Sequence, residues 1–145
     1  MKQIRQISAS EIIIVRHPVL RKGRSIESCV FKGDQEKTTF HFGYFENEKI
    51  IGVVSLFESK NGTFIVEKQF QIRGMAVLEN HQKKGIGNAL IVHCEKFATK
   101  QKAALIWFNA REKAVPFYIK MGFQISGTPF EIDTIGIHYL MYKRY

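Results

Sequence analysis

Residues 71–87 read QIRGMAVLENHQKKGIG, and this stretch decides the fold more than any other part of the chain. Its first half is rich in apolar and β-branched residues, which predicts a strand that ends near Val77. Its second half places Gly85 and Gly87 before a segment whose apolar residues recur every three or four positions. This spacing predicts an amphipathic helix with one buried face. The residues on that face are Ile86, Ala89, Leu90, His93, Cys94 and Phe97.

The turn between this strand and helix has the chemistry of an anion site. A helix N-terminus leaves backbone N–H groups without partners and carries a partial positive charge, so phosphate groups bind there readily. Gly85 and Gly87 have no Cβ that would keep a ligand from the backbone. The turn is not a P-loop, because Asn88-Ala89 follow Gly87, and it is not a dinucleotide fingerprint, because Leu90 replaces the third glycine. A plain strand-to-helix turn is the alternative.

The composition indicates one globular domain spanning residues 1–145. Hydrophobic residues make up 45% of the chain, which fits a packed core. The net charge of +9 results from 22 basic and 13 acidic residues, but the basic residues are scattered and form no nucleic-acid-binding motif. We therefore expect no nucleic-acid partner.

The cysteine, histidine and hydropathy patterns exclude further classes of protein. Cys29 and Cys94 do not cluster with histidines at the spacing of a metal site, so we expect no metal. Cys94 lies on the apolar helix face and is expected in the core. The chain does not begin with a long apolar run, which argues against a signal peptide or membrane span and favours the cytoplasm.

The order of the predicted elements is that of a mixed α/β (α+β) protein. Ser8-Ala9-Ser10-Glu11 fits a capping box at the start of a helix that stops near Pro18. Gly122 is well placed to cap the last helix. Residues 18–34 are hard to interpret and fit a helix broken by loops. The expected strands are residues 4–7, 38–45, 50–56, 64–77, 103–109, 123–126 and 135–143, with a turn at 46–49; the other helices are 85–99 and 114–121.

Four sequence motifs follow one another along the chain in the same order as in one known protein family. They are Glu48-Lys49-Ile50-Ile51-Gly52-Val53-Val54, Gln82-Lys83-Lys84-Gly85-Ile86-Gly87, Asn109-Ala110 and Ala114-Val115-Pro116-Phe117-Tyr118-Ile119-Lys120-Met121-Gly122-Phe123. With them the chain resembles the GCN5-related N-acetyltransferases (GNAT), which use acetyl-coenzyme A. The resemblance covers nearly the whole chain and is weakest from Pro18 to Asp34. It implies a GNAT-like, mostly antiparallel central sheet of about six to seven strands, flanked by about four helices.

The resemblance also implies roles for individual residues. Backbone groups at the end of the fourth strand would pair with the pantetheine arm and face the thioester oxygen, and the glycine-rich turn would hold the pyrophosphate. Tyr118 matches the general acid that protonates the departing thiolate, and its alternative is a core tyrosine. Asn109 matches a pantetheine contact, and its alternative is a helix cap or turn residue. The implied cofactor-binding residues are Met75, Ala76, Val77, Gln82, Lys83, Lys84, Gly85, Ile86, Gly87 and Asn109.

A general base is missing from the expected strand. Some branches of the family place Glu or His at positions that are Gln71 and Arg73 here, and neither is a plausible base. Arg73 fits either an ion pair with a neighbouring acid or a contact with a carboxylate or phosphate of the substrate. Proton removal would then use water, or Glu131 or His138, whose alternatives are a solvated loop carboxylate and an ordinary strand residue. Arg21, Lys22 and Arg24 would meet an anionic acceptor, the nucleotide end of the cofactor, or only water.

These observations lead to one hypothesis and one alternative. The hypothesis is an N-acetyltransferase that moves the acetyl group from acetyl-CoA to a primary amine, on a small-molecule acceptor, by direct transfer in a ternary complex. Small enzymes of this family are often homodimers, so we consider that state for this chain. The alternative is a non-catalytic acyl-CoA-binding sensor or scaffold of the same fold, which the missing base keeps open.

Overall fold

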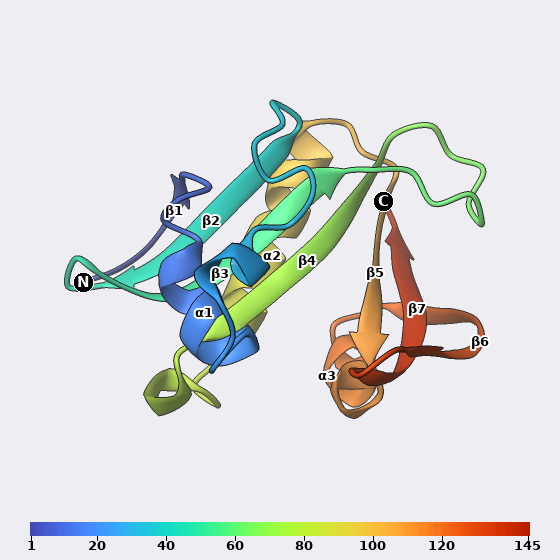
Figure 1. The fold of residues 1–145 in the computed structure, drawn as a ribbon. Coiled ribbons are helices and arrows are strands. Elements are labelled where there is room, and N and C mark those ends of the chain that lie inside the picture. Colours follow the sequence, from blue (N-terminus) through green and yellow to red (C-terminus); the bar gives the residue numbers. More distant parts are fainter. The chain divides into compact units, whose positions relative to one another are not determined.

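The computed structural model describes residues 1–145 and has seven strands and three α-helices (Figure 1). The strands are hydrogen-bonded in the order β1-β2-β3-β4-β5-β7-β6, which confirms a mixed, mostly antiparallel sheet. None of the helices is both long and apolar enough to span a membrane. The elements are β1 (Lys2–Ile7), α1 (Ile13–Leu20), β2 (Thr39–Glu46), β3 (Lys49–Glu58), β4 (Gln69–Val77), α2 (Ile86–Lys100), β5 (Leu105–Arg111), α3 (Val115–Lys120), β6 (Gln124–Ile132) and β7 (Gly136–Arg144).

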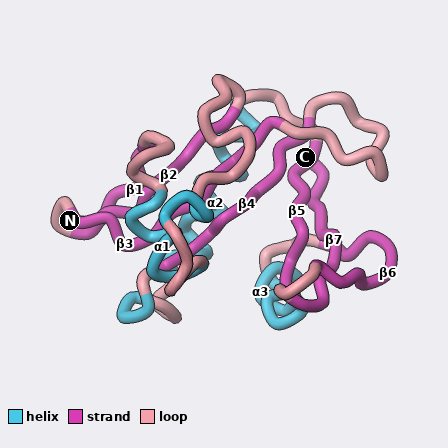
Figure 2. Tube along the Cα trace, in the orientation of Figure 1, coloured by secondary structure: helices cyan, strands magenta, loops and turns pink.

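The chain divides into two compact units. The first contains Met1–Glu58 and Ile72–Phe97, and the second contains Ser59–Gln71 and Ala98–Tyr145. The expected fourth helix is not present, because residues 18–34 contain only the end of α1 and a single 3₁₀ turn at Ile26–Cys29. Most of the segment between α1 and β2 is loop (Figure 2).

In the first unit, β1, β2 and β3 form an antiparallel meander. Asn47 and Glu48 connect β2 to β3 with φ values of 49° and 68°. Two left-handed residues in a two-residue loop match the right-handed twist of the flanking strands, as in a type I′ hairpin. The predicted turn at 46–49 is thereby confirmed.

The two faces of β3 are covered by different helices, and a glycine sets the closeness of one of them. Val53 belongs to the apolar cluster that packs under α1. Its neighbour Gly52 faces the opposite side, where an added Cβ would lie 3.0 Å from Ile86 and 3.3 Å from Leu90 of α2. The absence of a side chain at Gly52 therefore lets the first turns of α2 approach the sheet closely.

The capping box predicted at Ser8–Glu11 forms in the turn that precedes α1, whereas Ile12, the N-cap residue of α1, makes no side-chain capping bond. The Ser8 N–H donates to the Glu11 carboxylate over 3.0 Å, and the Glu11 N–H donates to the Ser8 hydroxyl over 3.2 Å. Hydrogen bonds from Ser8 lower the pKa of Glu11, and the bond from the Ser8 backbone has a larger effect than the one from its side chain. The helix passes through Pro18 and ends two residues later, at Leu20, which agrees with the predicted stop near Pro18. A proline that close to the helix end removes only one hydrogen bond of the last turn.

A buried ion pair anchors the irregular segment that follows α1. Arg16 is 0% exposed and donates to both carboxylate oxygens of Asp34, at 2.6 and 3.1 Å. It also donates to the Cys29 carbonyl at 2.8 Å and to the Ser55 hydroxyl of β3 at 2.9 Å. The ring of His41 on β2 bridges the Ser55 hydroxyl and the Asp34 carbonyl, at 2.7 and 2.9 Å. One network thus joins α1, β2, β3 and residues 29–34.

The second unit contains β5, β6, β7 and α3. Gly122 ends α3 with a φ of 96°, and the N–H of Phe123 donates to the Tyr118 carbonyl over 3.1 Å, which confirms the predicted glycine cap. The predicted strand at 64–77 begins too early, since β4 starts only at Gln69. The buried Gln69 side chain donates to the Val66 carbonyl at 2.9 Å and accepts from the Asn61 N–H at 2.8 Å, so residues 61–66 fold around it as a loop.

Both cysteines are free thiols with fully buried side chains. Cys94 lies on the buried face of α2, as its spacing predicts, and burial raises its pKa. Neither side chain is placed to form a disulfide or to react with a solute.

Replacing Asp34 with Asn should destabilise the protein strongly, because the buried guanidinium of Arg16 would lose its counterion. Breaking one partner of a buried pair costs about 3–5 kcal/mol in the free energy of unfolding. Urea denaturation followed by circular dichroism measures the difference. The matched control is Glu67→Gln, which breaks the exposed Lys60–Glu67 pair and should cost about 1 kcal/mol or less. Equal losses in the two variants would contradict this account of Arg16.

Candidate functional site

The glycine-rich turn before α2 leaves a helix N-terminus open to a ligand. Gly85 has a φ of 82°, and its carbonyl accepts the first helical hydrogen bond, from the Ala89 N–H at 3.0 Å. The N–H groups of the residues just after Gly85 therefore have no acceptor within the helix. An added Cβ at Gly85 would meet no atom within 4 Å, so the space beside this backbone is free.

The rest of the turn holds this geometry in place. The Gln82 amide donates to the Val77 carbonyl over 2.9 Å and so ties the turn to the end of β4. Lys83, with a φ of 63°, and Lys84 are exposed. Ile86 is 5% exposed and packs in the core, so only its main chain is available to a ligand. The predicted pyrophosphate residues thus form one contiguous turn with two free cations and an open backbone.

The end of β4 presents alternating environments. Ala76 is buried in the cluster under α1, whereas Met75 and Val77 are half-buried. Because successive strand residues point to opposite faces, Met75 and Val77 face away from α1. The Leu78 N–H donates to the Ile51 carbonyl over 2.9 Å, which fixes the end of the strand against β3.

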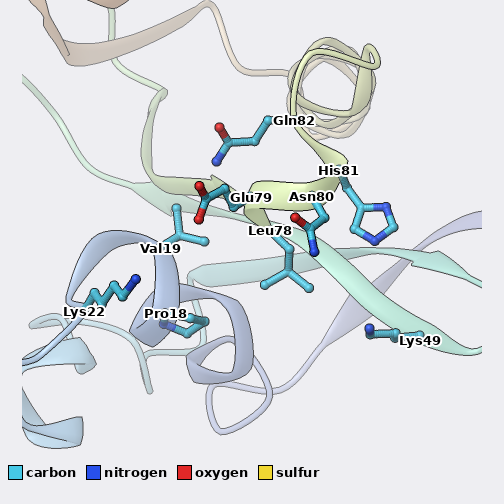
Figure 3. Close-up of a pocket in the computed structure, with 9 residues that line it drawn as sticks. All are labelled: Pro18, Val19, Lys22, Lys49, Leu78, Glu79, Asn80, His81 and Gln82. Carbon is cyan, nitrogen blue, oxygen red and sulfur yellow. The ribbon is translucent and has the colours of Figure 1, made fainter.

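A cavity of about 520 Å³ lies beside the same turn within the first unit. Figure 3 shows side chains from α1, from the start of β3 and from the segment after β4 around it. The lining mixes the cations Lys22 and Lys49 with Glu79 and apolar groups. The full lining is Pro18, Val19, Lys22, Lys49, Leu78, Glu79, Asn80, His81 and Gln82. Sequence reasoning missed this cavity, because its walls come from three segments with no shared motif.

Arg73 is half-buried on β4 but is not in an ion pair, so the alternative that it pairs with a neighbouring acid is wrong. Its guanidinium lies over aromatic rings instead, 4.7 Å from the centroid of Phe31 and 5.5 Å from that of Phe57. Burial lowers the pKa of Arg73, and the charge of Arg16 lowers it further. Next to it, Gly74 has a φ of 64° inside the strand, a conformation that breaks the regular alternation of side chains.

In the second unit, Tyr118 of α3 is 9% exposed and packs against Phe108, with ring centroids 4.4 Å apart. The ring is therefore buried in the core, and neither of its two predicted roles is excluded. Asn109 is an exposed residue within β5, opposite Leu140 of β7, so the alternative of a helix cap or turn is wrong.

The two alternative bases have different surroundings. His138 is buried on β7, and its Nδ1 lies 2.9 Å from the Gly136 carbonyl oxygen. Glu131 is exposed, and it lies in strand β6 rather than in the expected loop. Of the basic segment after α1, Arg21 is half-buried, whereas Lys22 and Arg24 are exposed.

Comparison with known proteins identifies the family. Residues 24–143 match the sequence profile of the acetyltransferase (GNAT) domain. The chain is 33% identical over 143 residues to the uncharacterized N-acetyltransferase YitI of Bacillus subtilis, covering 99% of this chain and 96% of that one.

Solved structures share the fold. The ribosomal-protein-S18-alanine N-acetyltransferase of Escherichia coli superposes with a TM-score of 0.79 at 18% identity, over 99% of this chain and 94% of that one. PaiA N-acetyltransferase of Thermoplasma acidophilum, solved with coenzyme A, superposes with a TM-score of 0.69 at 21% identity, over 100% and 99%. The sequence match over nearly its full length shows that this chain belongs to the GNAT family of acetyltransferases.

Proposed function

We propose that this protein is an acetyl-CoA-dependent N-acetyltransferase that acetylates a primary amine on a small molecule, with residues 1–145 acting as one catalytic domain. The observation that carries the proposal is the open helix N-terminus at Gly85 in a chain of the GNAT family. A relative with the same fold was solved with coenzyme A, which supports the choice of cofactor. Transfer would be direct, within a ternary complex of protein, acetyl-CoA and amine.

The pyrophosphate of the cofactor would bind the turn from Gln82 to Gly87. The N–H groups that follow Gly85 have no acceptor in the helix, and an anion there also gains from the helix dipole. Lys83 and Lys84 are exposed beside them and add two charges. The side chain of Gln82 would act indirectly, since it is already bonded to the Val77 carbonyl.

The acyl-bearing arm would run along β4. Residues 75–77 follow the part of β4 that pairs with β5, which covers Gln69–Gln71 and Leu105–Trp107. Backbone groups of Met75, Ala76 and Val77 would pair with the pantetheine amides as an added strand does. One N–H of this segment would stabilise the developing charge on the thioester oxygen, and Asn109 would contact the arm.

The chemistry requires a neutral amine and a proton donor for the leaving thiolate. The amine nitrogen would attack the thioester carbonyl carbon to form the C–N bond, and the C–S bond would then break. The phenol of Tyr118 would donate its proton to the departing sulfur. Because positions 71 and 73 hold Gln and Arg, the proton of the amine would leave through water, or through Glu131 or His138.

The second candidate function is a non-catalytic sensor or scaffold that binds acyl-CoA without turnover. It is favoured by one observation, the lack of an acid or histidine at positions 71 and 73 of β4. Both candidates share the cofactor site and differ in whether an added amine is acetylated.

Calorimetry with acetyl-CoA tests the cofactor site directly. Replacing Gly85 and Gly87 together with Val should weaken binding at least about tenfold, because side chains would cover the helix N-terminus. Gly62→Val is the control, since Gly62 lies in an exposed turn with no atom within 4 Å of an added Cβ. Melting temperatures separate lost binding from unfolding, because a left-handed φ costs a non-glycine residue about 1–2 kcal/mol. Unchanged affinity in a folded double variant would contradict the proposed site.

Replacing Tyr118 with Phe tests the general acid. Losing a positioned proton donor should lower kcat about 10²- to 10⁴-fold, while acetyl-CoA affinity measured by calorimetry stays unchanged. The matched control is Tyr142→Phe, which removes a hydroxyl that donates to Gln124 over 3.2 Å. If the two variants keep the same kcat, Tyr118 is a core tyrosine and the proposed acid role fails.

A further inference from the structure

Arg73 carries a positive charge that has no ion-pair partner in the chain, although the charge of Asp34 is near enough to raise its pKa slightly against the effect of burial. Its guanidinium is half-buried, and it makes neither a hydrogen bond nor an ion pair within the chain. A charge taken out of water is costly unless it is paired, and burial accordingly lowers the pKa of this arginine. A half-buried guanidinium without a partner does not stabilise the fold, so we look for a role in binding a ligand.

The one nearby carboxylate is already occupied. Both oxygens of Asp34 accept from Arg16, and one of them also accepts from the Phe31 N–H at 2.8 Å. Three guanidinium groups surround the Phe31 ring, with Arg16, Arg73 and Arg21 at 3.7, 4.7 and 5.4 Å from its centroid. Asp34 pairs with Arg16, so the charges of Arg73 and Arg21 remain available to a ligand.

The backbone keeps Arg73 on this side of the strand. At Gly74 the left-handed φ interrupts the alternation of β4, and an added Cβ would lie 3.0 Å from Phe31 and 3.1 Å from Nε of Arg16. A guanidinium that lies over an aromatic ring can keep its N–H groups directed outward in the guanidinium plane. This arrangement suits a planar oxyanion, which accepts two parallel hydrogen bonds from one arginine.

We propose that Arg73, supported by Arg21, binds a carboxylate on the acceptor, so that the substrate class is primary amines that also carry a carboxylate. The inference rests on the proposed acetyltransferase function and narrows its acceptor. Polycationic amines are disfavoured substrates, because Arg21 and Arg73 repel further positive charge. A carboxylate fits better than a phosphate ester, because a single arginine fork already matches its two oxygens.

The test compares acceptors that differ only in charge. Acetylation is measured for glycine, β-alanine, 4-aminobutyrate and L-phenylalanine, each beside its carboxamide, with spermidine and O-phosphoethanolamine as further amines. The wild-type protein should prefer the acid in at least one pair by roughly 10- to 100-fold in kcat/KM, as expected for a charge-assisted hydrogen bond. Arg73→Gln should abolish that preference while keeping the turnover of the amides, and Arg73→Lys should retain part of it.

The matched control is Arg144→Gln, which removes an exposed guanidinium that lies 5.5 Å from the Tyr142 ring centroid and should keep the preference. A preference for spermidine or O-phosphoethanolamine, or no preference in any pair, would overturn the proposal. Equal losses for acids and amides in Arg73→Gln, with a lower melting temperature, would assign Arg73 a structural role instead.

Binding measurements separate this inference from the proposed function. Calorimetry should show equal acetyl-CoA affinity for the wild-type protein and Arg73→Gln. A lower acetyl-CoA affinity in the variant would place Arg73 in the cofactor site and overturn the proposal. N-acetylglycine and the other N-acetylated acids, titrated without cofactor, should bind the wild-type protein more tightly than their amides do, and lose that advantage in Arg73→Gln. If the protein binds the N-acetylated acids in this way but does not bind acetyl-CoA, the acetyltransferase function is contradicted and the carboxylate site is not. If it binds acetyl-CoA but shows no preference for the N-acetylated acids, only the assignment of the acceptor is contradicted.

Discussion

The first unit depends on one buried guanidinium. Residues 21–37 belong to no strand ladder, so strand pairing does not hold their backbone. Arg16 replaces that support by bonding to Asp34, to the Cys29 carbonyl and to Ser55 of β3, while its planar face packs on Phe31 at 3.7 Å. The ion pair between Arg16 and Asp34 therefore sets the position of Phe31, whose ring lies beside the guanidinium of Arg73. The buried hydrogen bonds of this network favour one arrangement of its members, although Nε of Arg16 has no partner.

The parts of the fold that were predictable have local causes. The spacing of apolar residues from Ile86 onward is a property of α2 by itself, and the turn before it is marked by glycines. Asn47-Glu48 and Gly122 likewise act through their own backbone conformations. The glycine-rich turn could therefore be predicted residue by residue, and the space beside the Gly85 backbone is open.

The parts that were not predictable depend on distant partners. The segment from Phe64 to Lys68 has the residue types of a strand, but the side chain of Gln69 binds its carbonyls and folds it into a loop. The pairing of Arg16 with Asp34 spans 18 positions without a motif, so the sequence could not show that Arg73 lacks an acid. Gly74 was the available signal, since a glycine inside a strand pattern suggests a bulge.

The placement of the two cysteines has a chemical consequence for the acetyl-CoA-dependent activity proposed above. Thiolates exchange readily with acyl thioesters, and an exposed low-pKa cysteine would compete with the amine for the acetyl group. Cys29 and Cys94 are both 0% exposed, and burial raises the pKa of Cys94. Burial of both thiols would therefore protect the proposed enzyme from acylating itself, and it also shields the same sulfurs from oxidants.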